Sequence, residues 1–155
     1  LVFHLFRRLA PRFPAFRLLC VGLHALPPEA HGLADRVDLR PFVAPPDLAR
    51  IYAESAVTLV PSYVEGFGLP ALESMACGTP VVVSNRASLP EVVGDAAPTL
   101  DPDDIAAWER TVTRILVDAD FARGLSTRGL ERARTMTWER TASLWLDAVL
   151  NRRRT

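Results

Sequence analysis

Residues 65–73 read Glu-Gly-Phe-Gly-Leu-Pro-Ala-Leu-Glu, and this nonapeptide decides the fold. It follows the run Val57–Val60, which is short, apolar and rich in β-branched residues, as is typical of a buried parallel strand. Pro70 suits the first turn of a helix, because its missing N–H would have no partner there. Gly78 and Pro80 then end that helix after about two turns. The stretch therefore predicts a strand, a glycine loop and a helix, a unit that presents backbone N–H groups and a positive helix end to an anion.

Two carboxylates, Glu65 and Glu73, flank the loop with seven residues between them. Beside a phosphate they would repel it, so we expect them to contact neutral hydroxyl groups, such as the cis-diol of a sugar. Helical side chains lean toward the helix N-terminus, so Glu73 can reach toward the loop. The arrangement predicts a nucleotide-sugar, with one sugar at each acid and phosphates between them. An acid near a helix start is also favoured by the helix dipole alone, so Glu73 has a purely structural interpretation as well.

Residues 61–95, with their Glu-x7-Glu motif around Gly-Phe-Gly, closely resemble the donor-binding segment of retaining GT-B glycosyltransferases of the group 1 type (family four). The resemblance extends more loosely from Leu1 to about Leu150. It implies that residues 1–150 are the C-terminal, donor-binding domain of a hexosyltransferase. Such an enzyme transfers a hexose, with retention, from a donor such as GDP- or UDP-hexose to a saccharide, a lipid-linked acceptor or another hydroxyl. The family needs no metal or other cofactor.

By this resemblance, Glu65 contacts the transferred hexose and is the candidate catalytic residue, while Glu73 binds the ribose diol. The other candidate donor-binding residues act through their backbone amides, on hexose hydroxyls and the distal phosphate: Gly66, Phe67, Gly68 and Leu69. Glycine lets a ligand approach the main chain closely. Related enzymes are thought to use front-face attack by the acceptor, so Glu65 would position the hexose rather than attack it. Arg86 is the one cation near the motif; it could neutralise phosphate, but we favour its interpretation as a solvated side chain.

Composition excludes several classes of function. The chain has 155 residues and a formal net charge of zero, and its charges are mixed, which does not fit a nucleic-acid binder. All 18 basic residues are arginine, which we attribute to the codon usage of a GC-rich bacterium. Cys20 and Cys77 are expected to be buried thiols in a reducing compartment. No apolar run approaches a membrane span, so we expect a cytoplasmic protein, with the inner membrane face as an alternative and any membrane contact made by a domain outside this chain. The three histidines lack metal-ligand spacing, and no metal is expected.

Hydrophobic periodicity predicts strands alternating with helices up to residue 100 and helices alone from Asp101 onward. The expected strands lie near residues 17–22, 36–40, 57–60, 81–84 and 97–100. The expected helices lie near 2–13, 47–55, 70–77 and 89–93, and then from 101, over 120–134 and from 137. The alternation predicts an α/β fold with a Rossmann-like parallel sheet, flanking helices and a helical C-terminal tail. Ligands of such sheets bind at the carboxyl ends of the strands, where Glu65 falls.

Two further expectations concern what surrounds this sheet. A Rossmann order places a strand between residues 17–22 and 57–60, so we expect this chain to lack its first strand and to be part of a longer protein. The acceptor domain is expected to lie outside the chain, and the chain alone to be inactive. The basic, amphipathic helix near residues 2–13 could lie on a membrane, but a sheet-covering role is favoured because a strand follows at once.

Other interpretations of the same residues fall into three classes. The chain could be a non-catalytic nucleotide-sugar binding module, or part of a related GT-B enzyme such as a sugar phosphorylase. The intact Glu-x7-Glu motif argues against a sugar-nucleotide epimerase of that fold. A glycoside hydrolase would use Glu65 and Glu73 as acid and base, but a glycine loop at a helix N-terminus argues against it.

Overall fold

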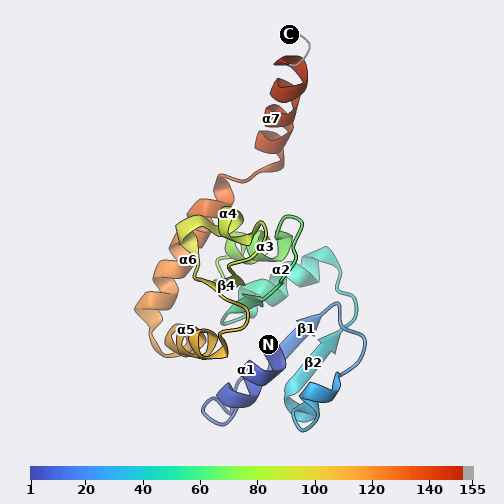
Figure 1. Cartoon of the computed structure of the whole chain (residues 1–155), viewed down its shortest axis with the longest axis vertical. Helices are drawn as coiled ribbons and strands as arrows, with labels where there is room; N and C mark the ends of the chain where they lie inside the picture. The colour runs from blue at the N-terminus through green and yellow to red at the C-terminus, as the bar shows by residue number, and fades with distance from the viewer. Residues whose placement is uncertain (152–155) are drawn as a thin grey trace.

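Five short strands and seven α-helices make up the part of the chain that the computed structural model describes, residues 1–151 (Figure 1). The strands are β1 (Leu18–Val21), β2 (Val37–Arg40), β3 (Thr58–Val60), β4 (Val81–Ser84) and β5 (Thr99–Leu100). The helices are α1 (Val2–Leu9), α2 (Pro45–Glu54), α3 (Leu69–Ala76), α4 (Leu89–Val93), α5 (Ile105–Val117), α6 (Ala119–Arg134) and α7 (Trp138–Asn151). The predicted α/β fold with parallel strands and flanking helices is confirmed.

The strands form two sheets instead of the single predicted one. In the first, β1 pairs with β2 in parallel, with Leu18 opposite Val37. In the second, β4 lies between β3 and β5, again in parallel, with Thr58 opposite Val81. The break falls between β1 and β3, which is where the sequence places an absent strand. We still predict that a further strand joins the two sheets.

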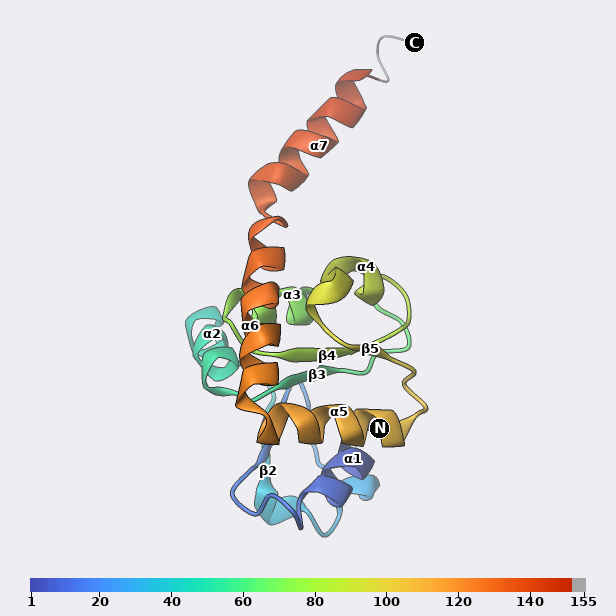
Figure 2. The same ribbon diagram turned by 90° about the vertical axis from the view of Figure 1, so that its left-hand side faces the viewer.

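Strand β4 is the centre of the larger sheet, and all four of its side chains are buried. Alternate residues of a strand point to opposite faces. Val81 and Val83 therefore pack into a cluster with residues of α3 and α4, including Met75 and Leu89. Val82 packs on the other face against α1 and α5, where Trp108 is completely buried. Figure 2 shows the result, with α3 and α4 covering one face of β3 and β4 and with α5 and α1 covering the other.

Two predicted helix boundaries are wrong for identifiable reasons. Helix α5 begins at Ile105 rather than at Asp101, with the Asp104 carboxylate accepting a hydrogen bond from the Ala107 N–H at 2.9 Å. Asp101 instead takes part in a turn, and its carbonyl accepts from the indole of the buried Trp108 at 2.9 Å. Helix α1 ends at Leu9, short of the predicted residue 13. Pro11 has no N–H to continue the helical hydrogen bonds, and the N–H groups of Arg12 and Phe13 both donate to the Leu9 carbonyl, at 3.0 and 3.1 Å, in a turn.

Helix α7 extends away from the rest of the described chain (Figures 1 and 2). It carries the predicted apolar stripe, yet Trp138 is 76% exposed and Trp145 is 68% exposed. No helix within residues 1–151 combines the length and the apolar character that crossing a membrane requires. Cys20 and Cys77 are free thiols, but they are half-buried rather than enclosed as expected. Burial raises the pKa of the Cys20 thiol.

Candidate functional site

The turn into α3 is built around Gly68. This residue precedes the first helical residue, Leu69, and has a φ of 107°, a conformation that strongly favours glycine. A Cβ atom at this position would lie 2.9 Å from Cδ2 of the fully buried Leu89, so space also requires glycine. Pro70 falls in the first helical turn, as its missing N–H predicts. The predicted succession of strand, glycine loop and helix is confirmed.

Ser88, which precedes α4, holds the loop from one side. Its hydroxyl lies 2.8 Å from the carbonyl oxygen of Phe67 and 3.3 Å from that of Glu65, so its single proton is shared between them. In a planar trans peptide, the N–H points opposite to the preceding carbonyl. The N–H groups of Gly66 and Gly68 therefore point away from Ser88.

The backbone amides of this loop form the candidate anion site. Within residues 1–151, the N–H groups of Gly66, Phe67, Gly68 and Leu69 donate no hydrogen bond to a protein acceptor. Four consecutive unused donors at the N-terminus of α3 supply the partial positive charge that an anion needs. Phe67 and Leu69 are 46% and 42% exposed, so two apolar residues of the loop remain in contact with solvent.

The two glutamates lie on different sides of the loop. Glu65 is half-buried beside α4, and its Cγ lies 3.9 Å from the position that a Cβ on Gly68 would take. Glu73 is exposed, and its Oε2 accepts a hydrogen bond of 3.2 Å from the hydroxyl of Tyr52 on α2. The unused amides of the loop lie between the two acids in sequence. A ligand spanning both acids would therefore extend from the α4 side to the α2 side.

Tyr52 is a site residue that sequence reasoning missed. Its backbone carbonyl accepts a hydrogen bond of 2.5 Å from the Thr79 hydroxyl, which fixes α2 to the end of α3. Burial, and then the neighbouring Glu73 carboxylate, raise the pKa of Tyr52. The phenol therefore stays protonated and donates to Glu73. Tyr52 precedes Glu73 by 21 positions, and no spacing rule connects the two.

The loops at the carboxyl ends of β3, β4 and β5 are tied together by polar contacts. Arg86 is about half exposed, in keeping with the expected solvated side chain, and it also pairs with Asp101 at 3.2 Å. Tyr63 donates a hydrogen bond to Asp103, another contact that the sequence does not signal. The described residues, 1–151, contain no group of three or more His, Cys, Asp or Glu side chains placed to hold a metal ion.

Comparison with known proteins identifies the class. The family model described as "Glycosyl transferases group 1" matches residues 1–118, and the chain belongs to this family. It is 42% identical over 107 residues to the O-antigen chain mannosyltransferase B of Escherichia coli, a match that covers 69% of this chain and 28% of that protein. The chain spans less than a third of the length of the curated relatives that it matches.

Solved structures support the same class. Sucrose-phosphate synthase from Thermosynechococcus elongatus has a TM-score of 0.76 and 29% identity, over 96% of this chain and 42% of that one. HepE of Anabaena, solved in complex with UDP-glucose, has a TM-score of 0.68 and 21% identity, over 77% of this chain and 33% of that one, and shows the fold alone. The predicted family and the GT-B type of fold are confirmed.

Proposed function

We propose that residues 1–150 form the C-terminal, donor-binding domain of a retaining glycosyltransferase that transfers a hexose from a nucleotide-sugar. The observation that carries this proposal is the row of four unused backbone N–H groups between Glu65 and Glu73. Diphosphate oxygens suit these donors, because the donors are fixed in place by the fold and sit at a positive helix end. Each acid then accepts hydrogen bonds from neutral sugar hydroxyls on either side of the phosphates.

In the proposed reaction, the oxygen of an acceptor hydroxyl forms a bond to the anomeric carbon of the hexose. The bond from that carbon to the phosphate oxygen breaks, and the nucleoside diphosphate leaves with the electron pair and takes the hydroxyl proton. Attack from the same face as the leaving group retains the configuration. The amides of Gly66 to Leu69 stabilise the charge that develops on the leaving phosphate, and such prearranged dipoles are usually the largest contribution to catalysis. Glu65 positions the hexose.

The donor is proposed to be a UDP- or GDP-hexose, and the acceptor a saccharide or a lipid-linked sugar. Similarity to a mannosyltransferase and the fold shared with a UDP-glucose-binding protein support this class of donor. The acceptor would be held by a second domain of the whole protein, which would work in the cytoplasm without a metal.

Thermal-shift measurements with UDP, GDP and their hexoses, followed by turnover assays on the whole protein, test the proposal. We expect one nucleotide to raise the melting temperature and its hexose to be transferred with retention. Tight binding without turnover of any acceptor would identify a binding module instead. Release of a sugar phosphate upon addition of inorganic phosphate would identify a phosphorylase. Absence of a shift with every nucleotide would refute the nucleotide site itself.

A further inference from the structure

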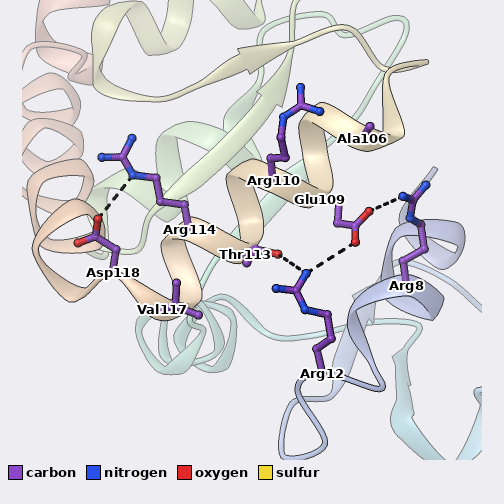
Figure 3. Close-up of a pocket in the computed structure, with 9 residues that line it drawn as sticks. All are labelled: Arg8, Arg12, Ala106, Glu109, Arg110, Thr113, Arg114, Val117 and Asp118. Carbon is purple, nitrogen blue, oxygen red and sulfur yellow. Dashed lines mark hydrogen bonds and ion pairs between the residues drawn. The ribbon is translucent and has the colours of Figure 1, made fainter.

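An open groove lies between α5 and the segment formed by α1 and the turn after it (Figure 3). Its volume is about 600 Å³, and it is a shallow surface groove rather than an enclosed cavity. Helices α1 and α5 cover the face of β4 opposite to α3, so the groove is separate from the loop of Gly66 to Leu69. The proposed donor site therefore makes no use of it.

The groove is rich in arginine. Four arginines line it, against two acids, Glu109 and Asp118. These arginines are Arg8, Arg12, Arg110 and Arg114. Two positive charges are thus in excess here, on a chain whose formal net charge is zero. A local excess of guanidinium groups in a groove attracts anions, and phosphates above all, because each planar guanidinium can donate two parallel hydrogen bonds.

Glu109 of α5 orients the arginines that come from the α1 segment. Its carboxylate pairs with Arg8 at 2.6 Å, and its other oxygen lies 3.8 Å from Arg12. The Glu109 side chain is only 19% exposed, whereas both arginines remain about half exposed. Arg12 also reaches the Thr113 hydroxyl at 3.5 Å, a long contact. Arg12 is therefore held at the groove by weak contacts and keeps most of its five N–H donors unused.

The α5 side of the groove presents two more guanidinium groups. Arg110 and Arg114 are four residues apart and lie on the same side of the helix (Figure 3). Like charges at this spacing are unfavourable unless something compensates them. Arg114 stacks 3.8 Å above the ring of Phe121 and has a long contact of 3.5 Å to Asp118. Within residues 1–151, Arg110 makes no ion pair and no side-chain hydrogen bond.

We propose that this groove binds a phosphate-bearing anion through Arg12, Arg110 and Arg114. Thr113, at the centre of the groove, adds a hydroxyl donor. Figure 3 draws the guanidinium groups of Arg12, Arg110 and Arg114 apart along α5 rather than at one point, so the proposed ligand carries more than one phosphate group, as a diphosphate does. The same chemistry would bind the phosphate headgroups of an anionic membrane, and experiment separates these two sources.

The test uses the full chain and a double variant, Arg12→Gln with Arg110→Gln, which removes one charge from each wall. The matched control is Arg50→Gln, because Arg50 is an exposed helical arginine, paired with Asp47, away from the groove. The single variant Arg110→Gln keeps the test informative if the double variant misfolds, since Arg110 makes no contact that the fold depends on. Thermal unfolding of every variant is compared with that of the parent protein.

In the first arm, inorganic pyrophosphate is titrated by calorimetry at fixed ionic strength. In the second, the protein is sedimented with vesicles of phosphatidylglycerol and phosphatidylcholine, and with phosphatidylcholine alone. We expect binding in at least one arm, weakened roughly tenfold or more by the double variant and unchanged in the control. Binding in the first arm identifies a soluble ligand, and binding only in the second identifies a lipid headgroup. No binding in either arm, or equal binding by the double variant, would overturn the proposal.

Discussion

Alanine substitutions at Gly66 and Gly68 should separate two reasons for glycine in the donor loop. At Gly68 the reason is backbone conformation and lack of space, and at Gly66 it is the close approach of the proposed ligand to the main chain. Gly68→Ala should destabilise the fold. A φ of 107° costs an L-residue roughly 1–2 kcal/mol, and forcing a Cβ to within 2.9 Å of Leu89 adds the cost of overpacking, about 1–3 kcal/mol. The free energy of unfolding should thus fall by about 2–5 kcal/mol. For a domain of this size, each kcal/mol of lost stability lowers the melting temperature by roughly 2–4 °C.

Gly66→Ala is the matched control for stability. No atom lies within 4 Å of a Cβ placed there, and its φ is not in the left-handed region. Its stability should stay within about 0.5 kcal/mol of the parent protein. Its affinity for the nucleotide-sugar should fall, because the added methyl group projects from main chain that the ligand is proposed to touch.

Urea unfolding and calorimetric titration with the donor measure both quantities on the same samples. A Gly68→Ala protein as stable as its parent would show that the loop does not have this geometry. A Gly66→Ala protein that binds the donor normally would show that the ligand does not approach the main chain at this position.

The remaining predictions concern the acids and the core. Glu73→Ala should weaken binding of the bare nucleotide by about 1.5–3 kcal/mol, and less so for a 2′,3′-dideoxy nucleotide. Tyr52→Phe should produce a smaller loss in the same calorimetric assay, because Tyr52 only orients the Glu73 carboxylate, through its 3.2 Å hydrogen bond. Glu65→Ala should reduce turnover and leave bare-nucleotide affinity nearly unchanged; a loss as large as that of Glu73→Ala would mean that the two roles are misassigned. Trp108→Ala should cost about 3–5 kcal/mol in chemical denaturation, since the whole side chain is buried, and a loss below 1 kcal/mol would contradict the packing described.

The site could be predicted from the sequence where it depends on residues that start or end helices and form turns. Pro70 and Gly78 bracket a helix, the run before them forms a strand, and the glycines between them mark a loop. These features depend on backbone preferences that each residue carries by itself. The strand, loop and helix, and the position of both glutamates within them, therefore followed from the motif.

Contacts between distant segments could not be predicted in this way. Ser88 orients the loop from more than 20 positions away, and Tyr52 reaches Glu73 from another helix. The start of α5 was misplaced because the Trp108 indole bonds to the Asp101 carbonyl and favours a turn over a helix there. The division into two sheets likewise depends on which strands meet in space, and periodicity along the chain carries no information about that pairing.

The three tryptophans lie in unequal environments, so their intrinsic fluorescence can report on changes at α7. Trp108 is enclosed in the core, whereas Trp138 and Trp145 face solvent on α7. Iodide should therefore quench the red-shifted part of the intrinsic emission and leave a blue-shifted remainder from Trp108. Any surface that comes to cover α7, whether a further domain, a second copy or a membrane, would shield the quenchable fraction and leave the core signal unaltered. Docking of the helix can thus be followed without a label.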